Sequence, residues 1–203
     1  SHQGSYNALV ELYNGRADIA TAHLWDEKAG EYNLTYIEKL LPGTPAVVIR
    51  LFGRMVGFLT AQGNPKGIED WAHLARPGVR LVNRERGSGI RVLLDEKLRK
   101  LRISPDRVAG YAAQRASHAA VAIAVATGEA DVGVGAQSAA RQVRGIDFVP
   151  MQREWYDMVI LAAREDEAAY RAVAEYVRSE AFAVELKKIG EYDFSQTGRT
   201  IRL

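Results

Sequence analysis

Short β-branched runs alternate with helical stretches along this chain, a pattern typical of an α/β fold with largely parallel sheets flanked by helices. Ala46–Thr60 is a long extended run rich in Val, Ile and Phe, and Asp157–Ala163 is a second such run. The first run is too long for one ordinary strand. Both runs therefore predict strands that cross between two lobes. Shorter strands are expected at Ala17–His23, Val79–Asn83, Val108–Tyr111 and Asp131–Gly135.

Apolar residues at helical spacing predict helices in both lobes. Three of them follow a serine that is expected to be the N-cap, namely Ser5, Ser88 and Ser117. A helix is also expected at Ile68–Ala75, and two more near the end of the chain, at Glu167–Val177 and Phe182–Ile189. Two crossing strands imply that these last helices return to the first lobe. The expected lobes are residues 1–55 with 156–203, and residues 56–155.

Composition narrows the classes of function. The chain has 203 residues, a net charge of +2 and no cysteine, and it carries no long run of one charge sign. We therefore expect no direct nucleic-acid binding, no disulfides and no zinc-thiolate site, and a cytoplasmic location suits the absence of cysteine. The most apolar stretch, Ala119–Ala126, is far shorter than the ~20 residues of a membrane span. No nucleophile, nucleotide or metal motif is present, so we expect a protein that is not an enzyme and needs no cofactor.

The serine-led helix starts suggest anion binding. A helix N-terminus presents unpaired N–H groups and the positive end of the helix dipole, and a serine adds a hydroxyl donor. The turn Gly87-Ser88-Gly89 is the most informative, because glycine lets the backbone approach a ligand. Arginines surround it, and Arg91 lies in the first helical turn, where a cation opposes the dipole unless Asp95 compensates it. The candidate anion-binding residues here are Ser5, Arg84, Ser88, Gly89, Arg91 and Ser117.

Further polar residues are expected near the same ends of the strands. Gln137 follows the strand Asp131–Gly135, and His118 follows Ser117. In the stretch HLWDEKAGEYN, the residues Asp26, Tyr32 and Asn33 have two interpretations. They line the site and recognise a ligand larger than a bare oxyanion, or Asp26 stabilises a turn, Tyr32 packs in the core and Asn33 caps the next helix.

Three strings resemble one known family: GSYNALVELYNGRADIATAHLWDEKAGEYN, GNPKGIEDWAHLARPGVRLVNRERGSGIRVLLDEKL and GYAAQRASHAAVAIAVATGEADVGVG. They are similar to the type II periplasmic-binding-protein-like domain of bacterial and archaeal regulators and molybdopterin-biosynthesis proteins, a relative of the molybdate and tungstate receptors. The resemblance implies a two-lobe clamshell. The family usually has Thr where Ile90 stands, and its domain begins earlier, with a strand and a helix that would complete the first lobe.

The resemblance implies that a tetrahedral oxyanion such as molybdate or tungstate contacts Ser5 from the first lobe and Ser88 and Ser117 from the second. The expected function is binding or sensing of a small anion as the effector domain of a regulator, with a linked DNA-binding or cofactor-synthesis domain and a homodimer among the candidate partners. Two alternatives remain open, a binding module associated with a molybdopterin enzyme and the solute-binding receptor of an ABC importer. No membrane contact is expected in either lobe.

Overall fold

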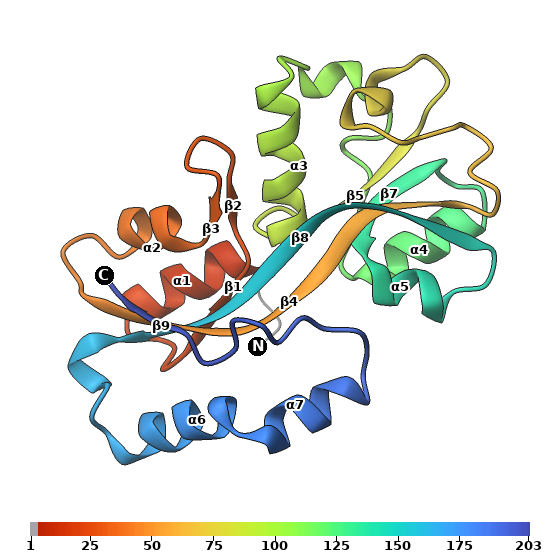
Figure 1. The fold of residues 1–203 in the computed structure, drawn as a ribbon. Helices are drawn as coiled ribbons and strands as arrows, with labels where there is room; N and C mark the ends of the chain where they lie inside the picture. The colour runs from red at the N-terminus through yellow and green to blue at the C-terminus, as the bar shows by residue number, and fades with distance from the viewer. Residues whose placement is uncertain (1–3) are drawn as a thin grey trace. The chain divides into compact units, whose positions relative to one another are not determined.

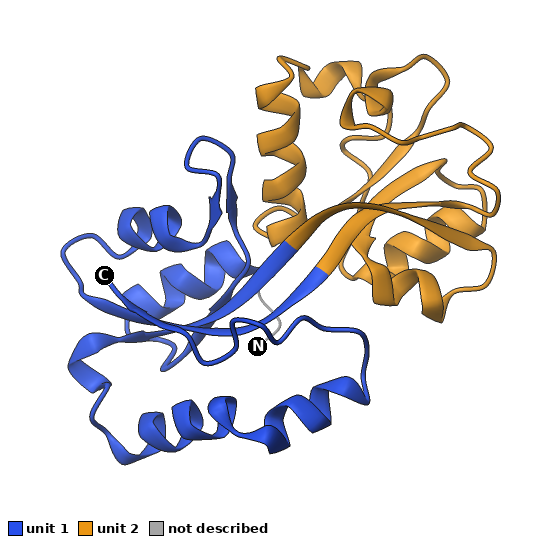
Figure 2. Cartoon of the chain, viewed as in Figure 1, with its two compact units in different colours: residues 1–54, 154–203 blue, residues 55–153 orange. Residues whose placement is uncertain are grey.

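The computed structural model describes residues 4–203 and divides the chain into two compact units (Figure 2). Unit 1 comprises the chain up to Arg54 together with Glu154–Leu203, and unit 2 comprises Met55–Arg153. Two long strands, β4 (Ala46–Ala61) and β8 (Ile146–Leu161), carry the chain from one unit to the other (Figure 1). The second crossing strand is longer than the expected run, because its half-buried first part mixes polar and apolar residues and gives no continuous apolar signal.

Unit 1 combines antiparallel strand pairs with helices. Strand β1 (Ala20–Ala22) pairs with β8, and β9 (Thr200–Arg202) pairs with β4. Apolar side chains of these strands pack with those of the helix α6 into one core cluster, composed of Val47, Ile49, Met158, Ile160, Tyr170 and Val177. The remaining elements are α1 (Ser5–Tyr13), β2 (Trp25–Asp26), β3 (Glu31–Tyr32), α2 (Leu34–Leu40), a 3₁₀ turn (Ala162–Arg164), α6 (Ala168–Arg178) and α7 (Glu180–Lys187).

Unit 2 holds the parallel part of the sheet. Strand β5 (Leu81–Arg84) pairs in parallel with β6 (Gln114–Arg115) and with β7 (Val132–Ala136), whereas β7 pairs with β4 in the antiparallel sense. The expected parallel pairing is thus found in β7–β5–β6, whereas β4 pairs with β7 and β9, and β8 pairs with β1, in the antiparallel sense. The helices are α3 (Gly89–Lys100), α4 (His118–Ala126) and α5 (Gln137–Gln142), with 3₁₀ turns at Trp71–Ala75 and Pro105–Arg107.

Several expected elements have different bounds. Val108–Tyr111 is not a strand, because turn bonds from Val108 N to Pro105 O and from Tyr111 N to Val108 O fold this segment, and the strand follows at β6. The expected helix at Ile68–Ala75 is a 3₁₀ turn whose Asp70 side chain accepts from Ala72 N. Strand β1 is shorter than expected. The pattern gave no sign of α5 or β9.

Two glycines of the first crossing strand permit close approach of neighbouring chain. A Cβ on Gly57 would lie 2.0 Å from the carbonyl oxygen of Val149, and one on Gly53 would lie 2.9 Å from the Trp155 ring. Any side chain at Gly57 would push β8 away.

The chain is a mixed α/β protein in which helices flank a central sheet. Across residues 4–203, no helix has the length and apolar character that crossing a bilayer requires.

Candidate functional site

The parallel strands of unit 2 end beside three helix N-termini. Helix α3 follows β5, α4 follows β6 and α5 follows β7, with only a short turn or none between strand and helix. Parallel neighbours in the order β7–β5–β6 have their carboxyl ends at the same edge of the sheet. This edge, defined by the starts of α3, α4 and α5, is called the unit 2 edge below. Ligands of open α/β sheets bind at such carboxyl ends.

Hydrogen bonds connect the three starts to one another. The guanidinium of Arg84, at the end of β5, donates to Ala116 O over 3.5 Å, immediately before α4. The backbone N–H of Ala136, at the end of β7, donates to His118 Nδ1 over 3.1 Å. The structure therefore brings together Arg84, the Ser117-His118 turn and the start of α5 at Gln137. Because Nδ1 accepts this bond, a neutral His118 ring carries its hydrogen on Nε2.

Ser117 caps α4 as the sequence predicts. Its Oγ accepts from Ala120 N over 3.0 Å, and the residue is exposed. No hydrogen bond within residues 4–203 uses the hydroxyl hydrogen, so Ser117 can donate it to a ligand while it still caps the helix. Gln137 is the first residue of α5 and is half-buried at the same edge.

Ser88 also caps its helix, but its hydroxyl is fully committed. The Oγ accepts from Arg91 N over 3.2 Å and donates to Glu85 O over 2.9 Å, and only 2% of the residue is exposed. The donors that the start of α3 can offer are therefore backbone N–H groups, beginning at the buried Gly89. Of the two cap serines, Ser117 is the one whose side chain is able to bind an anion as a donor.

The structure gives Arg91 a partner, which removes the expected reason for an anion beside it. Its Nε donates to both Asp95 oxygens, over 3.2 and 3.3 Å, and Nη1 donates to Arg84 O over 3.3 Å. The guanidinium lies 4.1 Å from the centroid of the Tyr111 ring, and Arg91 is only 5% exposed. Burial and the hydrogen bond to Asp95 raise the pKa of Tyr111. Asp95 thus offsets the cation at the start of α3.

Unit 1 contributes one helix start, and its serine differs from the expectation. Gly4, not Ser5, is the N-cap of α1, and no side chain caps this helix. The Ser5 side chain instead turns to the end of β1, where Oγ lies 2.8 Å from His23 Nδ1 and accepts from His23 N over 3.3 Å. Ser5 is 2% exposed. The region around Ser5 and His23 is called the unit 1 edge below.

Aromatic and charged residues outside the set of candidate anion-binding residues lie near His23. The Tyr156 ring stacks on the His23 imidazole at 4.5 Å between centroids, and the Phe52 ring also stacks on Tyr156, at 5.2 Å. Arg54 lies 5.3 Å from the centroid of the Tyr156 ring and forms a buried ion pair with Glu154. The sequence held one signal that points to Arg54 and Tyr156. Arg54 lies within the expected crossing run Ala46–Thr60, and Tyr156 directly precedes the expected run Asp157–Ala163.

Asp26 stabilises a turn and Tyr32 packs against a neighbouring ring, whereas the side chain of Asn33 has a different role. Asp26 Oδ1 accepts from Lys28 N and Ala29 N, and Oδ2 accepts from the Thr35 hydroxyl. The bond from Ala29 N is the main cause of the lowered pKa of Asp26, with contributions from the other two donors and from Lys39. Tyr32 packs on Trp25 with the centroids 4.9 Å apart. These contacts of Asp26 and Tyr32 all lie within unit 1.

Asn33 holds unit 1 together instead of capping α2 through its side chain. The residue occupies the N-cap position with φ of 72° and is fully buried, but it makes no side-chain cap bond. Its Oδ1 accepts from Leu24 N over 2.7 Å, and Nδ2 donates to Asp157 Oδ2 over 2.7 Å. Asp157, also fully buried, pairs with Arg50. Among the described residues, no cluster of His, Asp and Glu side chains could hold a metal ion.

Comparison with known proteins places the chain in a family. Residues 1–178 match the PBP superfamily domain, also called PBP-like. The chain belongs to this family. The uncharacterized protein YvgK of Bacillus subtilis is 40% identical over 200 residues, which are 98% of this chain and 64% of that protein. The chain thus spans less than two thirds of the length of this relative.

Solved structures of the family share its fold. The ABC-type phosphate transport receptor from Vibrio cholerae has a TM-score of 0.59 at 18% identity, over 94% of this chain and 85% of the receptor. The substrate-binding domain assigned to a molybdenum ABC transporter from Clostridium difficile has a TM-score of 0.55 at 16% identity, over 94% and 83% of the two chains. The chain therefore has a PBP-like fold, and its two units are those described above.

Proposed function

We propose that this PBP-like chain binds a small tetrahedral oxyanion, such as molybdate or tungstate, and senses it as the effector domain of a regulator. The unit 2 edge supplies the donors: the Ser117 hydroxyl, the Gln137 amide, and backbone N–H groups at the starts of α3 and α4. Ser5, at the unit 1 edge, is a separate candidate donor. The observation that carries the proposal is the convergence of three hydrogen-bonded helix starts at one edge of a parallel sheet.

The free energy of several such hydrogen bonds is large enough for micromolar binding of an anion. A hydrogen bond to a charged partner contributes about 1.5–3 kcal/mol, and micromolar affinity corresponds to about −8 kcal/mol. One helix start is therefore insufficient, whereas four or five converging donors are sufficient. The edge donors are neutral, so they favour an anion that arrives fully deprotonated and has no hydrogen of its own to place.

A transport receptor is the second candidate, and the likeness to phosphate and molybdenum receptors favours it. A module associated with a molybdopterin enzyme is the third. Both bind an anion in the same way as the sensor does, and they differ in what the rest of the protein does. Binding itself is therefore tested first.

The test is a titration of the protein with molybdate, tungstate, sulfate and phosphate, followed by calorimetry and by thermal unfolding. An anion at one hundred times its Kd should stabilise the fold by about 2.7 kcal/mol, which is roughly 5–11 °C for a chain of this size. If none of the four anions binds or raises the melting temperature, the proposal is wrong.

The Ser117→Asp variant tests the position of the site. A carboxylate still caps α4, but it repels an anion at about 4 Å by some 4 kcal/mol at an effective dielectric constant of ~20, so Kd should rise at least about 100-fold. Ser179→Asp is the matched control, because Ser179 caps α7 in unit 1 through the same bond, to Phe182 N. Equal loss of affinity in both variants, or in neither, would contradict the assignment.

A further inference from the structure

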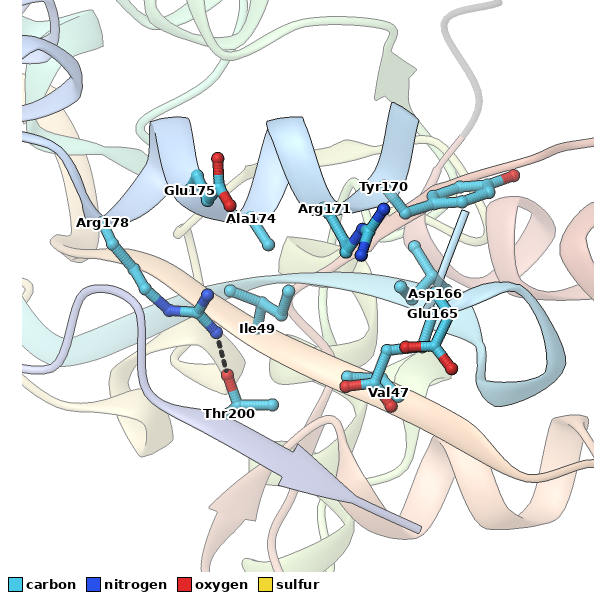
Figure 3. A pocket seen from close by; sticks show the side chains of 11 residues that line it. Val47, Ile49, Glu165, Asp166, Tyr170, Arg171, Ala174, Glu175, Arg178 and Thr200 are labelled. Atoms are coloured by element: carbon cyan, nitrogen blue, oxygen red, sulfur yellow. Dashed lines mark hydrogen bonds between the residues drawn. The ribbon is translucent and has the colours of Figure 1, made fainter. Parts of the chain in front are cut away.

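A hollow lies within unit 1, between helix α6 and the strands β4, β8 and β9 (Figure 3). Its volume is about 230 Å³. The floor is apolar and consists of Val47 and Ile49 on β4 and Ile160 on β8, all buried in the core of unit 1. The hollow shares no residue with the unit 1 edge around Ser5 and His23.

The hollow exists because α6 faces the sheet with one small residue. Tyr170 and Val177 fill the space at their turns of the helix, and both are buried. Ala174 lies between them at the same face and has only a methyl group, so the side chains of Ile49 and Ile160 have no partner of full size opposite it. A leucine at position 174 would fill much of this space.

Charges of both signs surround the apolar floor. Arg178 reaches from α6 to β9 and donates to the Thr200 hydroxyl over 2.8 Å, as Figure 3 shows. At the other end of the hollow, Glu165 pairs with Arg202, and Asp166 lies beside it. Arg171 lines the hollow between these ends, and its guanidinium makes no hydrogen bond or ion pair within residues 4–203. The hollow thus combines an apolar floor with the carboxylates of Glu165 and Asp166 at one end. Beside them lies the guanidinium of Arg171, which has no partner within the described residues.

We propose that this hollow binds a small α-amino acid with a short branched alkyl chain. The carboxylate of the ligand pairs with Arg171, its ammonium group pairs with Asp166, and the alkyl chain covers Ile49, Ile160 and Ala174. The hollow holds about as much volume as eight water molecules, taking roughly 30 Å³ for each, and valine has about eight non-hydrogen atoms. Larger, drug-sized ligands need at least about 300 Å³.

The balance of charge favours a zwitterion over a simple ion. Three carboxylates, of Glu165, Asp166 and Glu175, and three guanidinium groups, of Arg171, Arg178 and Arg202, lie in or beside the hollow. A ligand with a net charge would therefore meet repulsion from one set or the other. A zwitterion of the right length satisfies both ends, and its alkyl chain removes water from the apolar floor.

The first experiment compares three ligands of the same alkyl skeleton by calorimetry and by chemical-shift mapping: L-valine, isovalerate and isobutylamine. L-Valine should bind with a Kd at or below about 1 mM, with shifts at Ile49, Ile160 and Ala174. Isovalerate and isobutylamine each lack one charged group and should bind at least about tenfold more weakly. Equal binding of all three, or no binding of L-valine, would overturn the proposal.

Two variants test the site without disturbing the fold. Ala174→Leu should abolish L-valine binding while it keeps or raises the melting temperature, because it fills a gap in the core. Arg171→Gln should raise Kd at least about tenfold, and the matched control Arg144→Gln removes an exposed arginine of unit 2 and should leave Kd unchanged. If Ala174→Leu binds L-valine as well as the wild type does, the ligand is not in this hollow. Oxyanion binding, measured on the same variants, should not change.

Discussion

The two candidate anion-binding edges are constructed differently, although the sequence presents both as a serine before a helix. The unit 2 edge is held by bonds that each join a side chain to a backbone group, and it leaves the Ser117 hydroxyl hydrogen for a ligand. The unit 1 edge rests on buried side chains, and its serine is bonded to a histidine. The same local motif therefore supplies a ready donor in one unit and a donor that depends on protonation in the other.

The largest expected effect concerns how the unit 1 edge is held. Asp157 is fully buried and bonds Arg50 Nε over 2.8 Å, while Asn33 donates to its other oxygen. Asp157→Ala leaves the buried guanidinium without its carboxylate, which typically costs about 3–5 kcal/mol. Urea unfolding should show a loss of that size in the free energy of unfolding.

Asp18→Ala is the matched control, because Asp18 also pairs with an arginine of unit 1, Arg164, but its side chain is 77% exposed. Exposed pairs contribute about 0–1 kcal/mol. If the two variants lose similar stability, buried charge does not hold the unit 1 edge, and the contrast with unit 2 fails.

The next prediction concerns the effect of pH on anion binding, which should distinguish the unit 1 edge from the unit 2 edge. Ser5 has one hydroxyl hydrogen, and a neutral His23 ring that accepts at Nδ1 uses it. A protonated ring donates at Nδ1 instead, which releases the Ser5 hydrogen to an anion and adds a positive charge. Sulfate, which stays a dianion, should therefore bind more tightly when His23 is protonated than when it is neutral, and calorimetry repeated at successively lower pH measures the change.

Other charged groups near His23 bear on this titration. Tyr156 stacks on the ring, Arg54 lies over Tyr156 and pairs with Glu154, and Asp157 stands opposite Ala22 in the strand register. His23→Gln keeps a donor to Ser5 that does not titrate, so calorimetry should then show a flat pH profile. A wild-type profile that is equally flat would mean that His23 does not control the hydroxyl.

The sequence predicted the caps of α3 and α4, but it did not predict which distant residues the polar side chains of unit 1 bond to. The caps Ser88 and Ser117 were predicted because a cap bonds to an N–H only three residues away. His23 lies 18 positions from Ser5, and Asp157 lies 124 positions from Asn33, so no periodicity connects them. The role of Ser5 could not be predicted for this reason. Asp95 was visible at the right spacing from Arg91, and only the structure shows that the two are paired.

The smallest expected effect is on stability at the two serines. Ser117→Gly keeps a residue that is favoured at N-caps and should change the free energy of unfolding by only a few tenths of a kcal/mol. Ser5→Ala removes a buried hydroxyl bonded to His23 and should cost about 1–3 kcal/mol, because a buried polar group loses its partner. Thermal and urea unfolding of both variants measure this difference. A Ser117→Gly variant that loses as much stability as Ser5→Ala would show that the Ser117 hydroxyl serves the fold of unit 2, and its hydrogen would then no longer be reserved for an anion.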